Sequence, residues 1–317
     1  MFPVVFSYGS FFIPSYGVVI AVGILVAMWL ASFRARQRGL PVDRFYDLVF
    51  IAILSGFLGG RVFYILLNFE DFLKDPMALI LSRSGFVFLG GFAGAMLALY
   101  IAIQRFKLPL LPTADVLIVS LCFAHGFGRI ACWAAGCCFG GVCSLPALSV
   151  QFTPKVMPGT ENSPGGPEFF YNAFEEHQDL GLIPLDALAS LPVWPVQLME
   201  AIGLFILGAV LWWYADSKPR QSGFVLAFYM IAYGLLRFTL EFLRGDLERG
   251  LFLGVSTSQW ISLGLIPLGV ILLYFIHHLP LMPHSHKSLA QRVQVDEDQK
   301  PKRFTAAASA PNPPRHE

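Results

Sequence analysis

Seven apolar stretches, each as long as a transmembrane helix, constrain this chain more than any other feature. An α-helix needs about 20 mostly apolar residues to cross the hydrocarbon core of a bilayer. Only 14% of the 317 residues are charged, against about 25% in an average soluble domain. The qualifying stretches lie near residues 14–33, 46–67, 86–105, 114–134, 194–215, 223–243 and 257–276. The predicted fold is therefore all-α, integral to the membrane, with about seven transmembrane helices.

The charges between these stretches predict how the chain is oriented. Basic residues accumulate in the cytoplasmic loops of membrane proteins. Here they gather in alternate loops, at Arg34, Arg36, Arg38 and Arg44, at Arg105 and Lys107, and at Lys218 and Arg220. The long segment from about 140 to 193 contains one basic residue, Lys155, and six acidic ones. We therefore expect a periplasmic N-terminus, a cytoplasmic C-terminus and a periplasmic segment between the fourth and fifth helices.

The same patterns divide the chain into two regions. Residues 1–276 form the membrane domain, and its insertion at about 140–193 is rich in Pro, Gly and Ser near Pro158 to Pro167. We expect the insertion to be a small loop domain without a second hydrophobic core, or a simple connection. Residues 277–317 are polar and are expected to form a disordered cytoplasmic tail. No cleavable signal peptide is expected, because Met1 to Ser10 carries no positive charge.

Nucleic acid is not an expected partner. The formal net charge is +1, and no basic stripe is present to neutralise a row of phosphates.

Charged residues inside the predicted spans are the first candidates for a functional site. A charge at mid-membrane costs at least about 2.5–3.5 kcal/mol on insertion scales, so it normally has a partner and a role. Arg61 lies well inside the second span, next to Gly59 and Gly60. Arg61 either binds substrate or extends its guanidinium to the nearer membrane interface.

The fourth and sixth spans carry the strongest candidates. His125 and Arg129 are four residues apart and share one helical face. An imidazole can act as a base near neutral pH, and a guanidinium binds phosphate through two parallel hydrogen bonds. The simpler alternative is that His125 hydrogen-bonds a neighbouring helix. On the sixth span one stripe carries a phenol, a guanidinium and a carboxylate, with a second guanidinium close by; these residues are Tyr233, Arg237, Glu241 and Arg244.

The Arg237 and Glu241 pair predicts an intrahelical ion pair, which can be structural and still orient the guanidinium. Gln197 and Glu200, three residues apart at the start of the fifth span, can hydrogen-bond the arginines. Tyr16 lies early in the first span and is a weaker candidate, because tyrosine is common at membrane interfaces.

These residues, in this order, resemble the bacterial prolipoprotein diacylglyceryl transferase family. The resemblance covers residues 10 to 276. The matching stretches are Pro14-Ser15-Tyr16-Gly17, Leu58-Gly59-Gly60-Arg61, Phe88-Leu89-Gly90-Gly91, Ala114-Asp115, Gly128-Arg129 through Gly140, Pro195 through Glu200, and Tyr233 through Arg244. A paired-cysteine signature at Cys137 and Cys138 is similar to that of a divergent branch of the family.

The resemblance implies an enzyme of the bacterial inner membrane. Such enzymes move a diacylglyceryl group from phosphatidylglycerol to the lipobox cysteine thiol in the signal peptide of a prolipoprotein. Arg129 and Arg237 then contact the phospholipid headgroup, and Tyr16 and Tyr233 line the site. Arg61, Gln197, Glu200, Glu241 and Arg244 are the further expected substrate-binding residues. Phosphatidylglycerol, prolipoprotein and membrane lipids are the expected partners, and neither a metal nor a soluble cofactor is expected.

One departure from the family leaves other functions open. Leu89 occupies the position where the family usually has a histidine, so the expected base is missing. His125 can replace it, because a thiol with a pKa near 8.5 needs a base close by. Transfer to a different acceptor is one alternative. A lipid or lipoprotein binder, or a lipid transporter, that has lost catalysis is another.

Four chemistries are open to the clustered cysteines. We favour a disulfide such as Cys138 to Cys143, which suits an oxidising periplasm. The alternatives are buried free thiols, a thiol that carries the lipid covalently, and a zinc site that adds Cys143 and His125 to Cys137 and Cys138. Adjacent thiols on one backbone rarely complete a tetrahedral zinc site without help.

Overall fold

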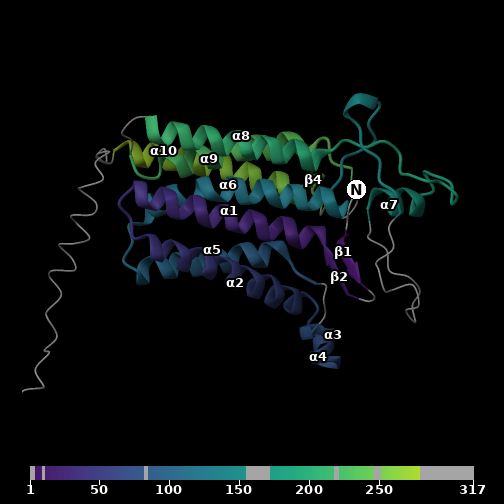
Figure 1. Ribbon diagram of the computed structural model, residues 1–317, viewed down its shortest axis with the longest axis horizontal. Helices are drawn as coiled ribbons and strands as arrows, with labels where there is room; N and C mark the ends of the chain where they lie inside the picture. Colours follow the sequence, from purple (N-terminus) through teal and green to yellow (C-terminus); the bar gives the residue numbers. More distant parts are fainter. Residues whose placement is uncertain are drawn as a thin grey trace, which may run out of the picture.

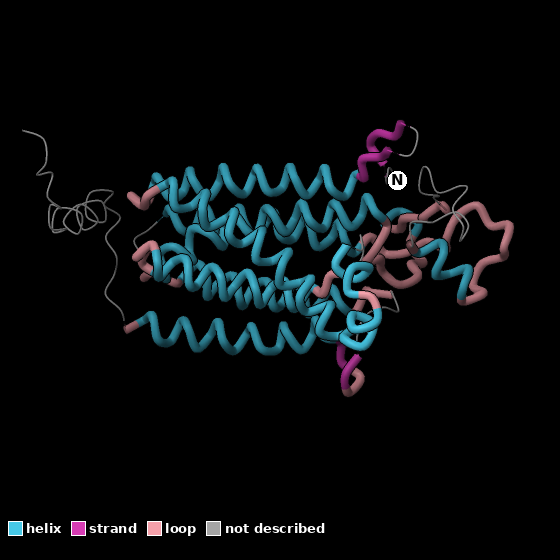
Figure 2. Tube along the Cα trace, turned by 90° about the horizontal axis from the view of Figure 1, so that it is seen from below, coloured by secondary structure: helices cyan, strands magenta, loops and turns pink. Residues whose placement is uncertain are grey.

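Seven long helices run side by side and form the body of the molecule (Figures 1 and 2). The computed structural model describes residues 4–8, 11–81, 85–154, 172–217, 221–245 and 251–278. Within them, the long helices are α1 (Ser15–Gln37), α2 (Val42–Leu67), α5 (Phe88–Arg105), α6 (Leu110–Ala135), α8 (Val196–Ser217), α9 (Phe224–Glu241) and α10 (Thr257–His277). All seven are long and apolar enough to cross a membrane. The prediction of a seven-span helical membrane protein is confirmed, whereas the predicted disordered tail lies outside the described residues.

Local sequence signals account for where these helices begin and end. Prolines directly precede α1, α2 and α6, where the missing N–H of proline costs nothing. Ser256 opens α10 with a capping box, in which its hydroxyl accepts from the N–H of Gln259. Gly136 ends α6 with a φ of 89°, the left-handed conformation that glycine adopts without a steric penalty.

The helices of the bundle fall into two parts. α6 packs against α1 and α8, and α9 packs against α8 and α10. α2 pairs chiefly with α5, and this pair lies along one side of the bundle (Figure 1). A Cβ atom on Gly59 would lie 2.6 Å from the carbonyl oxygen of Gly90, so only glycine allows this close approach. Glycines on both helices therefore bring the backbones of α2 and α5 together.

The smaller elements gather at one end of the bundle, which we call the outer end (Figure 1). They comprise the hairpin of β1 (Val4–Tyr8) and β2 (Phe11–Pro14), α3 (Phe69–Lys74), α4 (Pro76–Leu81), η1 (Pro146–Leu148), α7 (Ala173–Asp179), and the hairpin of β3 (Leu251–Phe252) and β4 (Val255–Ser256). None of these short elements was predicted. α6 ends and α8 begins at this same end, so these elements border any site there.

The segment after α6 has a hydrophobic core of its own. Phe152 and Val193 are fully buried there, and Phe139 and Phe174 pack with them. The prediction that the insertion lacks a second core was therefore wrong. Its spaced apolar residues only meet because Asn172 caps α7 and because Val150 and Val193 exchange backbone hydrogen bonds. The Pro- and Gly-rich stretch near 158–167 lies outside the described residues.

Candidate active site

Glu200 is the centre of a charged cluster near the outer end of the bundle. It lies in the first turns of α8 and is 1% exposed. Its Oε2 atom is 3.1 Å from Arg129 Nε on α6 and 3.7 Å from Arg237 Nη1 on α9. The Tyr233 hydroxyl donates to its Oε1 atom at 3.3 Å. A buried carboxylate is stable only with such partners, and here it brings two guanidiniums from different helices together.

The stripe predicted along α9 is present. Arg237 Nη2 is 2.8 Å from Glu241 Oε2, which confirms the predicted ion pair one helical turn apart. The same Nη2 donates to the hydroxyl of Ser258 at 2.8 Å. Arg244 Nη1 lies 3.9 Å from Glu241 Oε2. Among the described residues, the cluster therefore contains three arginines and two glutamates, an excess of positive charge that suits an anionic ligand.

His125 faces this cluster from α6. Its Nε2 atom is 3.9 Å from Glu200 Oε1, and its ring meets the ring of Tyr233 edge-on at 5.2 Å between centroids. The His125 side chain is 25% exposed, whereas that of Glu200 is 2% exposed. The expectation that His125 and Arg129 converge is confirmed. Its role as a base stays a prediction.

Two other predicted residues border the cluster. Tyr16, near the start of α1, lies within electrostatic reach of Arg129. Gln197 does not contact the arginines as predicted: its Nε2 donates to the carbonyl oxygen of Cys137 at 2.9 Å. Because α8 starts next to the chain that leaves α6, Gln197 supports that chain instead.

Arg61 makes its contacts in the α2 and α5 part of the bundle. It donates to the carbonyl oxygens of Leu79 and Gly85, the latter at 2.9 Å. Its guanidinium also lies 5.3 Å from the ring centroid of Phe86. These contacts connect α2 to the segment before α5, and substrate binding by Arg61 stays a prediction. Leu89, at the position of the missing histidine, is half exposed on the surface of the bundle.

The cysteines are arranged differently from the favoured prediction. All five are free thiols, so the predicted disulfide between Cys138 and Cys143 was wrong. Cys143 Sγ instead accepts from the N–H of Leu145 at 3.4 Å. The thiols that meet are those of Cys132, Cys137 and Cys138, all within 4.8 Å of one another. Cys132, at the end of α6, was missed, although its spacing across Gly136 from the cysteine pair was a usable signal.

The chain reversal after α6 explains this arrangement. Gly136 turns the backbone, and Cys138 follows with a φ of 60°. Cys143 lies further along, in an extended segment where its N–H donates to the Pro192 carbonyl oxygen. Outside the membrane spans, hydrogen bonds with the thiols of Cys132 and Cys137 lower the pKa of Cys138, and the charges of Arg244 and Arg129 lower it further. Hydrogen bonds with Cys132 and Cys138 raise the pKa of Cys137.

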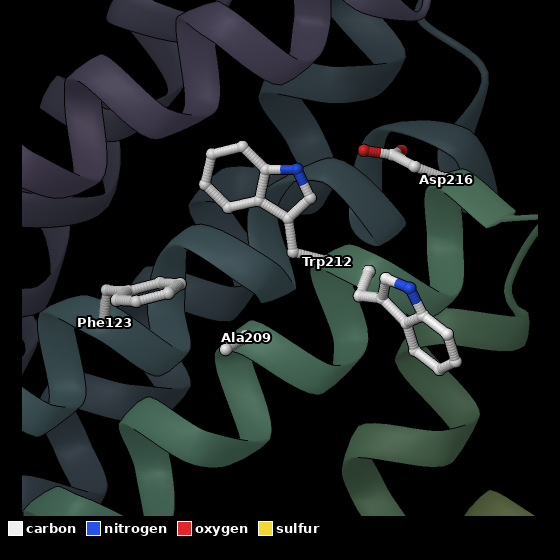
Figure 3. Close-up of a pocket in the computed structure, with 5 residues that line it drawn as sticks. Phe123, Ala209, Trp212 and Asp216 are labelled. Carbon is white, nitrogen blue, oxygen red and sulfur yellow. The ribbon is translucent and has the colours of Figure 1, made fainter.

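A separate pocket lies near the C-terminal end of α8, at the end of the bundle opposite the outer end, which we call the inner end; its lining residues are drawn in Figure 3. It is lined by Phe123, Ala209, Trp212, Trp213 and Asp216. Asp216 follows Glu200 by sixteen residues on α8, so the two carboxylates are about 24 Å apart along the helix. The pocket is therefore distinct from the charged cluster.

Fold and site together define a class: a multi-pass membrane protein with arginines and glutamates clustered inside its helix bundle. Residues 3–275 match the family described as prolipoprotein diacylglyceryl transferase. The chain is 34% identical over 270 residues to the phosphatidylglycerol–prolipoprotein diacylglyceryl transferase of Clostridium tetani, covering 85% of this chain and 96% of that protein. It is 30% identical over 289 residues to the enzyme of the same name from Enterobacter sp., covering 88% and 94%.

The chain belongs to the prolipoprotein diacylglyceryl transferase family. The expectation of a membrane-embedded transferase of this family is confirmed.

Proposed function

We propose that this protein transfers the diacylglyceryl group of phosphatidylglycerol to the lipobox cysteine thiol of prolipoproteins. The relatives named above carry this activity in their names. The observation that supports it most is the convergence of Arg129 and Arg237, from different helices, on one oxygen of Glu200. A phosphodiester that enters there meets two guanidiniums held in place before it binds.

In this reaction the thiol sulfur attacks the carbon of the diacylglyceryl group that is bonded to the phosphate ester oxygen. An S–C bond forms, the C–O bond breaks, and glycerol phosphate leaves. Negative charge grows on the leaving phosphate, and guanidiniums stabilise charge that develops in a low-dielectric site. Arg129 and Arg237 supply this stabilisation, while Glu200 and Glu241 hold them in position.

The remaining residues have supporting roles in the proposal. Tyr16 and Tyr233 orient the headgroup, and Arg244 and Arg61 contribute further positive charge for the lipid. Gln197 acts indirectly, because it holds the Cys137 carbonyl next to the site. His125 accepts the thiol proton, since it lies beside the arginines and is less buried than Glu200. Replacement of His125 by Ala should abolish lipidation, and full activity of this variant would reject that role.

We further propose that the outer end of the bundle faces the periplasm in a bacterial inner membrane. The acidic segment between α6 and α8 and the basic residues Arg34, Arg36 and Arg38 at the opposite end support this orientation. The lipobox and the lipid then reach the arginine cluster from the same side, with the lipid entering laterally between helices.

The test is an assay of the purified protein with phosphatidylglycerol labelled in its acyl chains and a lipobox peptide. The proposal predicts a labelled thioether on the peptide and release of glycerol phosphate. A peptide with serine in place of its cysteine is the matched control and should stay unlabelled. Headgroup release without peptide labelling would indicate a different acceptor. If neither product forms, the protein is a binder or transporter, and the proposal is contradicted.

A further inference from the structure

Three thiols beside the arginine cluster form a group of the size that holds a metal ion. The Sγ atoms of Cys132, Cys137 and Cys138 lie within 4.8 Å of one another. Zn–S bonds are about 2.3 Å long, which places sulfurs about 3.8 Å apart around a tetrahedral ion. Separations of at most 4.8 Å are compatible with this spacing, because half-buried side chains can rotate slightly toward a common ion. Within the described residues, the group contains thiols only, which is the donor set that soft metal ions prefer.

The backbone explains how two adjacent cysteines join a third. In extended backbone, neighbouring side chains point to opposite faces. Cys138 departs from this rule, because its φ of 60° lies in the left-handed region that non-glycine residues rarely adopt. The reversal begins at Gly136, whose N–H donates to the carbonyl oxygen of Cys132 at 2.9 Å. Such strained residues cluster at binding and catalytic sites.

The thiols continue the functional face of α6. His125, Arg129 and Cys132 are spaced four and three residues apart, so they share one stripe of the helix. Arg129 and Arg244 lie within electrostatic reach of Cys138. Gln197 binds the Cys137 carbonyl oxygen at 2.9 Å, three residues before the central Glu200. The three thiols therefore border the place where an acceptor must meet the bound lipid.

We propose that Cys132, Cys137 and Cys138 hold a Zn²⁺ ion whose fourth position binds the acceptor thiol of the substrate. This inference rests on the proposed function, because it concerns how the acceptor is activated. Zinc sites that act in catalysis keep one position open, and a thiol that coordinates zinc loses its proton. The ion held by the three cysteines thus activates the substrate thiol in a chain that has Leu89 where a histidine is expected.

The step balances without a redox partner. The substrate thiol binds Zn²⁺ as a thiolate and releases its proton to His125. The thiolate sulfur then forms a bond to the glycerol carbon while the C–O bond to phosphate breaks, and glycerol phosphate departs. The thioether is a weaker ligand than the thiolate, so it leaves the ion. Zn²⁺ fits better than Cu⁺, because its second positive charge offsets more of the charge of three thiolates.

The first test measures the metal content of the full-length protein, purified in detergent with a tag that contains no histidine. We expect about one zinc per chain by mass spectrometry of the digested protein. Cys132→Ser, Cys137→Ser and Cys138→Ser should each lose most of it. Cys143→Ser is the matched control and should keep it, because Cys143 contacts Leu145 instead of the cluster. Equal metal in all four variants, or none in the unmodified protein, would overturn the proposal.

The second test does not depend on any cysteine variant folding. The zinc is exchanged for Co²⁺, whose spectrum reports thiolate ligands and coordination number. Three thiolate ligands should give charge-transfer bands, and a lipobox peptide should shift the visible bands while its serine counterpart does not. Visible bands that stay unchanged when the lipobox peptide is added would contradict an open fourth coordination position. If alkylation detects a disulfide among the three cysteines, the zinc proposal is overturned, and the cysteines are a redox pair instead.

These outcomes separate this inference from the proposed function. Thioether formation by a protein without zinc would overturn the zinc site and leave the transfer activity standing. Zinc binding without thioether formation would overturn the proposed function, which is transfer of the diacylglyceryl group to a thiol.

Discussion

Two groups of charged residues occupy opposite ends of the helix bundle and are built differently. At the inner end, Arg34 and Arg38 pair with different oxygens of Asp216, at 3.0 and 3.4 Å, and Arg38 also donates to the carbonyl oxygen of Ala215. Asp115 accepts from the N–H groups of Gly223 and Leu226, at 2.7 and 2.9 Å, and so caps the start of α9. Each of these charges has a local partner that also joins two helices.

In the outer group, by contrast, two arginines approach a single carboxylate oxygen. Arg129 and Arg237 approach the same Glu200 oxygen, and Arg237 and Arg244 approach the same Glu241 oxygen. Three guanidiniums with two carboxylates are not fully neutralised by one another. A charge inside a span is therefore not by itself evidence of a site. A charge that closes a contact stabilises the fold, whereas arginines that outnumber the carboxylates around them can bind an anion.

The largest expected effect follows from removing an outer arginine. Arg129→Gln and Arg237→Gln should each lower the rate of thioether formation about 10²–10³-fold, because each removes a donor that stabilises the leaving phosphate. Arg38→Gln at the inner end is the matched control and should keep its rate. Equal losses of activity in the outer and inner variants would contradict the assignment of the site to the outer arginines. The measurement is the single-turnover rate with labelled phosphatidylglycerol.

A smaller effect is expected from Glu200→Gln, which keeps the shape of the side chain and removes its charge. The arginines then lose their shared anchor, and we expect the rate of transfer to fall about tenfold, or about 1.4 kcal/mol. Glu200 is a positioning residue, so kcat should fall more than KM for the lipid rises. A change in thermal stability without a change in kcat would make Glu200 purely structural.

A substitution at the inner end should change the stability of the protein and leave its activity unchanged. Asp115→Ala removes the acceptor of two N–H groups at the start of α9, and loss of such a cap costs about 0.5–2 kcal/mol. We expect a lower midpoint of thermal unfolding and an unchanged rate per folded molecule. A loss of activity in the folded variant would show that the two ends are coupled.

The smallest effect concerns pH and the segment after α6. His177 is buried, and its Nδ1 accepts from the N–H of Leu191 at 3.2 Å. Burial lowers its pKa below the ordinary value near 6.5. The folded segment therefore favours neutral His177, and its stability declines as pH falls below about 6.5. The protection factors of residues 172–193 in hydrogen exchange, which correct for the slower intrinsic exchange at low pH, should be smaller at pH 5 than at pH 7. His177→Gln should remove most of this difference.

The transmembrane helices were predictable because their signal is local. Length and apolarity alone identify a span, and prolines and capping residues mark its ends, as at Pro41 and Ser256. The core of the segment after α6 was not predictable, since Phe139, Phe152 and Phe174 lie in separate apolar fragments. Only their backbone pairing with residues near Val193 brings them together.

The candidate site was predictable for a similar reason, and only in part. Residues one helical turn apart, such as His125 with Arg129 and Arg237 with Glu241, share a face by helix geometry. The central position of Glu200 depends on how α6, α8 and α9 pack, which sequence spacing does not report. The thiol cluster depends on the left-handed turn at Cys138, a conformation that a cysteine rarely adopts.

The central claim is that Arg129 and Arg237 hold the phosphate of the lipid together. Native mass spectrometry of the detergent-purified protein with phosphatidylglycerol tests it most directly, because it measures binding without turnover. We expect the unmodified protein and Arg38→Gln to retain phosphatidylglycerol in preference to uncharged diacylglycerol, and the double variant Arg129→Gln and Arg237→Gln to lose this preference. An unchanged preference in the double variant would contradict the account.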